Sequence, residues 1–103
     1  MNATNLELSN RINTVGSIVK NLGDAPVPSY VIAEPRGAGV HWTTSDPDTI
    51  RAIITAIPGP WETYSHGAIG LSRYATGGST NYTIDVLGDP ATLLAQARAE
   101  VQR

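Results

Sequence analysis

The spacing of apolar residues between Val40 and Trp61 predicts a strand, a helix and a sharp turn. Val40 and Trp42 share one face of an extended segment, and His41 points to the other face. Four isoleucines then recur at helical spacing, which places their side chains on one face that must be buried. They are Ile50, Ile53, Ile54 and Ile57. We therefore expect a helix over about 47–57, packed against the sheet that contains the preceding strand.

Residues that start and stop helices bound this segment. Ser45 or Asp46 can cap the first turn, and the proline that follows is tolerated there. The run Pro58-Gly59-Pro60 cannot continue a helix, so the chain turns and returns the next residue to the core. A second Asp-Pro pair at 89–90 predicts another amphipathic helix over about 90–101.

A heptad-like stripe of apolar residues predicts a helix over about 5–22. Its members recur at spacings of four, three, four and three, and they are Leu8, Ile12, Val15, Val19 and Leu22. Two arrangements fit this stripe: a helix that lies on the sheet of its own chain, or helices of two copies paired in a homodimer. The stripe is therefore the candidate self-association face. Gly16 within the helix indicates a close approach by another backbone.

The remaining segments alternate apolar and polar residues, which predicts strands. A hairpin is expected over about 30–43, with a five-residue, glycine-containing loop from Pro35 to Gly39. A three-strand meander is expected over about 61–87, with turns at His66-Gly67 and at 76–79. Each strand of the meander has one apolar face and one polar face, so we expect one face of the sheet to be buried.

Together these elements predict one domain that covers residues 1–103, a length that suits a single modest core. The order is α-β-β-α-β-β-β-α. The economical packing is α+β, a mainly antiparallel sheet with helices packed on one face. Local patterns leave open whether the hairpin and the meander belong to the same sheet.

Composition narrows the possible functions. The chain has 7 basic and 9 acidic residues, so it lacks the positive charge that neutralises phosphates, and nucleic acid is an improbable ligand. The absence of cysteine excludes disulfides and thiolate metal sites. No segment approaches the ~18 apolar residues of a membrane span, and the N-terminus lacks a signal-peptide pattern. We therefore expect a cytoplasmic protein without a membrane partner.

Residues that could carry chemistry are few and form no local motif. His41 and His66 have neither the spacing of metal ligands nor that of a catalytic motif. Ser65 and Ser72 lie near His66 in sequence, but no nucleophile elbow is present. We therefore expect no enzymatic activity, no metal and no cofactor, with an enzyme that uses His41 or His66 as an alternative. Exposed tyrosine, tryptophan or arginine side chains are candidate anchors for a partner protein.

From Asp46 to Glu62, an Asp-Pro helix start, an alanine- and isoleucine-bearing helix and the run Pro-Gly-Pro-Trp-Glu follow one another. This order resembles small uncharacterised proteins encoded by phages of actinobacteria, over less than half of the chain. The resemblance implies a small non-structural protein that binds a host protein in the bacterial cytoplasm. A virion or assembly component is the alternative. The group has no shared catalytic motif, so the resemblance assigns no residue a role.

Overall fold

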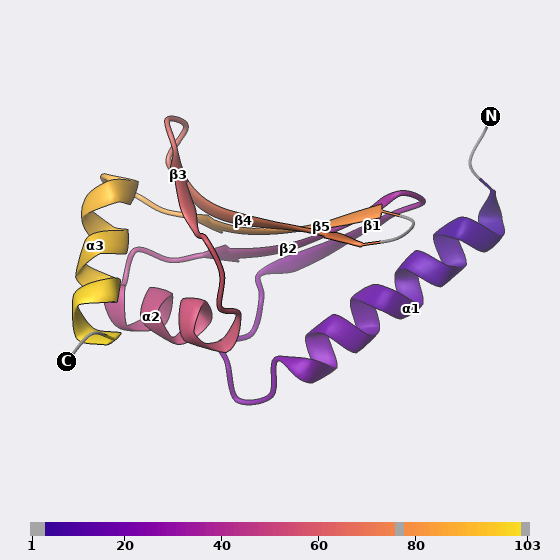
Figure 1. Cartoon of the computed structure of the whole chain (residues 1–103), viewed down its shortest axis with the longest axis horizontal. Helices are drawn as coiled ribbons and strands as arrows, with labels where there is room; N and C mark the ends of the chain where they lie inside the picture. The colour runs from indigo at the N-terminus through magenta and orange to yellow at the C-terminus, as the bar shows by residue number, and fades with distance from the viewer. Residues whose placement is uncertain (1–3, 76–77, 102–103) are drawn as a thin grey trace.

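The computed structural model describes residues 4–75 and 78–101 and confirms the predicted order of helices and strands (Figure 1). The helices are α1 (Asn5–Asn21), α2 (Pro47–Ala56) and α3 (Pro90–Val101). The strands are β1 (Tyr30–Glu34), β2 (Gly37–Thr43), β3 (Glu62–Tyr64), β4 (Ala68–Ala75) and β5 (Gly78–Asp85). Within the described residues, no helix combines the length and the apolar character needed to cross a membrane.

The five strands form one sheet in the order β1-β2-β5-β4-β3. Neighbours are antiparallel except for β2 and β5, which run parallel. Parallel neighbours cannot be joined by a tight turn, and the segment from α2 to β4 supplies the crossover between them. The parallel pair therefore joins the hairpin and the meander in a single sheet, which the sequence had left open.

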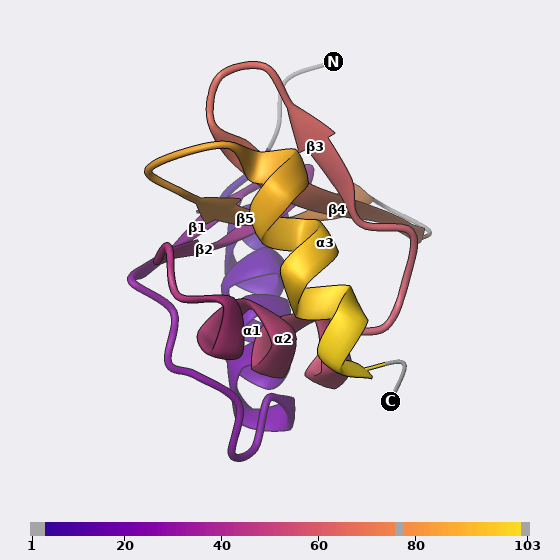
Figure 2. The same ribbon diagram turned by 90° about the vertical axis from the view of Figure 1, so that its left-hand side faces the viewer.

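The helices pack on one face of the sheet, and the core lies between the two layers (Figure 2). α1 contacts β1 and β2, whereas α3 packs on α2 and crosses the end of the sheet at β3 and β4. The largest fully buried side chains include Trp42 of β2, Ile50 and Ile53 of α2, and Ile84 of β5. The burial of the isoleucine face and of Trp42 confirms the packing that the apolar spacing predicts.

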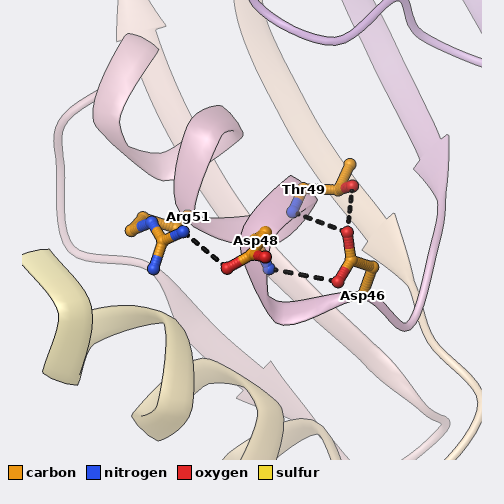
Figure 3. A network of polar contacts seen from close by, with 4 residues as sticks. All are labelled: Asp46, Asp48, Thr49 and Arg51. Carbon is orange, nitrogen blue, oxygen red and sulfur yellow. Dashed lines mark hydrogen bonds and ion pairs between the residues drawn. The ribbon is translucent and has the colours of Figure 1, made fainter.

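Asp46 is the residue that caps α2 (Figure 3). Its carboxylate accepts hydrogen bonds from the backbone N–H groups of Asp48 and Thr49, and from the Thr49 hydroxyl at 2.8 Å. At the other end, the indole Nε1 of Trp61 donates to the carbonyl of Ile57 at 2.8 Å. This bond returns the chain to the core after the Pro-Gly-Pro turn, as the sequence predicts.

The caps of α2 and α3 predict a stability that falls in acid. Hydrogen bonds from the Thr49 side chain lower the pKa of Asp46, and bonds from the Thr92 side chain lower the pKa of Asp89. Because these pKa values are lower in the folded than in the unfolded chain, the stabilisation is complete above the ordinary value of 3.8 and is lost as the pH falls through the folded values.

We therefore expect the thermal unfolding midpoint of the native chain to drop between about pH 5 and about pH 2 by more than that of an Asp46→Asn, Asp89→Asn double variant. The two chains differ only at the two capping positions, so the difference between the two curves isolates the caps. Parallel curves would show that the caps contribute nothing to the acid sensitivity.

The β1–β2 hairpin differs from the prediction in its loop. β2 begins at Gly37, so residues 35–36 connect the strands in place of the expected five-residue loop. Gly39 therefore lies in a strand, where a Cβ atom would approach Nε2 of His41 to 3.2 Å. Glycine serves turns and tightly packed strands alike, and here it makes room for the neighbouring imidazole.

Gly16 has no close neighbour, which makes the predicted backbone approach wrong within this chain. A Cβ atom at Gly16 would meet nothing within 4 Å. The predicted turn over 76–79 falls partly on residues 76–77, which lie outside the described residues. β5 begins at Gly78, which pairs with Ala75 of β4.

Candidate functional site

The described residues leave the face of the sheet opposite the helices uncovered (Figure 1). The residues of β2 and β5 on this face include His41, Asn81 and Thr83, which are polar. The strand register arranges its residues in rows that cross three strands. One row is His41, Thr83 and Gly70, and the next is Gly39, Asn81 and Ser72. The β3–β4 hairpin rises beside this face, on the side of the sheet away from α1 and α2, and α3 lies next to β3 (Figure 1).

A groove of about 440 Å³ lies on the uncovered face. β1 and β2 form one side, and the β3–β4 hairpin forms the other. The side chains that line it include Ile32, Glu34, His41, Tyr64, His66, Ser72, Asn81 and Thr83. Gly37 and Gly39 also line the groove, and because they have no side chains they leave its space open. The volume lies within the ~300–1,000 Å³ of ordinary ligand pockets.

On each side of the groove a histidine that lines it stacks on a tyrosine; Tyr64 lines the groove as well, whereas Tyr30 is not part of the lining. The rings of Tyr30 and His41 have centroids 4.5 Å apart and planes 11° from parallel. The rings of Tyr64 and His66 have centroids 5.5 Å apart and planes 4° from parallel. Stacking restricts the motion of each ring, so the groove presents aromatic surfaces that are already positioned for a ligand.

Tyr64 lies over Gly70 of β4, which fixes the position of this side of the groove. A Cβ atom at Gly70 would collide with the Tyr64 ring. Gly70 is buried although it lies on the uncovered face, because the ring covers it. The sequence indicates both histidines and, in general, exposed tyrosines as candidate residues, but it does not predict which tyrosine stacks on which histidine. The alternation of apolar and polar residues predicts which side chains of a strand share a face. It does not predict which residues of neighbouring strands lie side by side.

Hydrogen-bonding groups fill the space between the two aromatic pairs. The Ser72 hydroxyl donates to Oδ1 of Asn81 at 2.7 Å, and Thr83 lies between His41 and Gly70 in the register. Nδ1 of His41 is buried and has no hydrogen-bond partner among the described residues. The groove thus combines aromatic surfaces and neutral hydrogen-bonding groups with two charged residues in its lining, Glu34 and Arg36.

The groove brings together His41 and His66, which are distant in sequence. The imidazole of His41 is not held by a hydrogen bond to its Nδ1, which has no partner among the described residues. Each imidazole is instead held by stacking. Residues 4–75 and 78–101 contain no cluster of three groups able to hold a metal ion.

The structure divides the candidate self-association face on α1. Val15 is 5% exposed, Leu22 packs against the core, and Leu8 is half-buried. Ile12 and Val19 are 54% and 38% exposed. Val15 is covered within its own chain, because α1 lies on β1 and β2. Self-association stays a prediction, which now rests on the outer flank of the stripe.

Comparisons of the chain with protein-family models, with curated proteins and with solved structures each gave no match. Function is therefore inferred from the groove on the uncovered face and from the exposed edges of the sheet.

Proposed function

We propose that the protein is a non-enzymatic binding protein that receives a segment of a partner protein in the groove on its uncovered sheet face. The observation that carries this proposal is the position of His41 on one side of the groove and of Tyr64 and His66 on the other, with Tyr30 stacked on His41. Tyrosine is among the residues that contribute most to binding at protein interfaces. Because stacking already restrains the rings of Tyr64 and His66, these side chains lose little conformational freedom when a partner binds.

An extended protein segment matches the chemistry of the groove. Tyr64 and Ile32 provide apolar surface on opposite sides, and Asn81 and Thr83 provide hydrogen-bonding groups between them. Ordinary peptides carry both kinds of group, in alternation along an extended backbone. The chain has a net charge of only −2, so we expect binding to depend weakly on salt.

The resemblance to phage proteins supports a host protein as the partner. In that setting the chain acts in the cytoplasm of a bacterial host, and binding alters the activity of the protein that it captures. The alternative of a virion component would instead require the chain in purified phage particles at a fixed copy number.

We expect Tyr64→Ala to reduce capture of the partner at least about tenfold, because tyrosine is enriched among the interface residues whose truncation costs about 2 kcal/mol or more, and about 1.4 kcal/mol is a factor of ten. The measurement is affinity capture of the tagged chain from an actinobacterial lysate, with retained proteins quantified by mass spectrometry. Leu87→Ala is the matched control, since Leu87 is 86% exposed and does not line the groove.

Support requires one host protein that the native chain and the Leu87→Ala control retain reproducibly and that folded Tyr64→Ala loses. Circular dichroism checks that each variant is folded. Equal retention by all three chains, or no retained protein with a folded native chain, would contradict binding in the groove.

A further inference from the structure

The two edges of the sheet differ in how they are protected. β3, at one edge, is only three residues long and lies beside α3. β1, at the other edge, pairs with β2 alone among the described strands, and its five residues are in unbroken register. It contains none of the lysines, prolines or bulges that usually prevent edge-to-edge pairing. β1 is therefore able to accept another strand.

The residues of β1 are also unusually apolar for an exposed edge. Tyr30, Val31 and Ile32 are consecutive, and they are 49%, 43% and 39% exposed. Tyr30 and Ile32 point to the uncovered face, whereas Val31 points to the side of the helices, because its partner Val40 is in the core. Both faces of the edge thus expose apolar surface.

The outer flank of α1 continues this surface on the side of the helices. Arg11, on the inner flank, reaches the position of Gly78 at the start of β5. Ile12 and Val19 lie about 80–100° further round the helix, so they face away from β5 and toward the free edge of β1. Gly16 lies on the same flank, with open space in front of it. We call Ile12, Val19, Tyr30, Val31 and Ile32 the edge strip.

We propose that the edge strip is the interface of a homodimer in which β1 pairs antiparallel with β1 of a second copy. A two-fold axis perpendicular to the sheet and through Ile32 places this residue beside its own counterpart. Val31 then faces Ala33 of the second copy, and Tyr30 faces Glu34. Glu34 is the one charged residue of the strand, and it does not face Glu34 of the second copy. The strand is therefore complementary to a second copy of itself.

This axis also keeps the helices of both copies on one side of the extended sheet. The two α1 helices then lie next to each other, and Ile12 and Val19 of each copy contact the other copy over the space at Gly16. One operation thus pairs the free edge of β1 and covers Ile12 and Val19 of α1, while Tyr30 and Ile32 keep their place on the uncovered face. A strand from an unrelated protein would cover β1 and leave the flank of α1 exposed, which favours the second copy.

Sedimentation velocity on the full chain tests the proposal. We expect the native chain to have twice the 10.9 kDa mass of one copy. Val19→Lys and Ile32→Lys should each lose the dimer and keep their circular dichroism spectrum, because both positions are on the surface. Leu87→Lys, outside the edge strip, should keep the dimer. A native chain that stays monomeric at every concentration, or dimers that persist in both edge-strip variants, would overturn the proposal.

A cross-link tests the strand pairing without relying on a disruptive substitution. Directly opposed residues in antiparallel strands have Cα atoms about 4.5–5.5 Å apart, within the range that a disulfide spans. The native chain has no cysteine, so Ile32→Cys introduces a single thiol at the proposed axis. Mild oxidation should link Ile32→Cys into dimers and leave Leu87→Cys largely unlinked. Equal linking of the two variants would overturn the pairing of β1 with its own copy.

Discussion

Replacing Trp42 with alanine should lower the free energy of unfolding by about 3–5 kcal/mol, which is a large part of the stability of a domain of this size. Trp42 is 2% exposed, and its ring packs on Tyr82 with centroids 6.5 Å apart. Its indole Nε1 donates to the carbonyl of Pro26 at 2.8 Å. The substitution therefore leaves a cavity in the core and removes the bond that holds the connector before β1.

Urea denaturation of the native chain and of Trp42→Ala measures this loss. Tyr74→Ala is the control, because Tyr74 is 84% exposed and its truncation should change the free energy by no more than about 0.5 kcal/mol. A loss below about 1 kcal/mol for Trp42→Ala would place the tryptophan outside the stabilising core.

Replacing Val15 with glutamate should cost about 2–4 kcal/mol, because the substitution inserts a charge between α1 and the sheet. Val15 is 5% exposed and is the most buried residue of the apolar stripe on α1. Ser17→Glu is the matched control, since Ser17 is exposed on the same helix and the same charge there should change stability by no more than about 0.5 kcal/mol.

The same denaturation experiment separates the two arrangements that the stripe allows. Packing of α1 on its own sheet predicts that Val15→Glu loses stability even at concentrations where the chain is a monomer. A folded Val15→Glu chain with native stability would mean that α1 does not need the sheet of its own chain.

Local features of the sequence predicted most of the fold. The isoleucine spacing of α2, its Asp46 cap and the tryptophans at 42 and 61 depend on neighbours within a few positions, so the sequence alone indicates them. The parallel contact of β2 with β5 joins segments about 42 positions apart, and no local pattern specifies it. The fold class was therefore predictable, whereas the order of strands was not.

The candidate site was only partly predictable, because it depends on the length of the loop in the β1–β2 hairpin. A five-residue loop at 35–39 would place Tyr30 opposite Thr44, whereas the two-residue connection places it opposite His41. Glycines that suit both a turn and a strand left this choice open. His41 and His66 could be named as candidates, but their meeting in one groove follows from the strand order and not from their spacing.

The apolar stripe on α1 was also only partly informative about the structure. Its spacing indicates which residues are apolar neighbours on the helix, but the contact with the sheet decides which flank is covered. Val15 and Leu22 face the core, and Ile12 and Val19 stay on the surface. A periodic pattern therefore predicts a buried face without showing whether its own chain or a second copy buries each residue.

Histidine-selective NMR is the most direct test of binding in the groove. The chain has two histidines and both line the groove, so every imidazole signal reports on this face. Spectra of the chain alone and with the protein retained from the lysate are compared. Binding in the groove predicts that the signals of His41 and His66 both shift or broaden. Formation of the complex with both imidazole signals unchanged would contradict it.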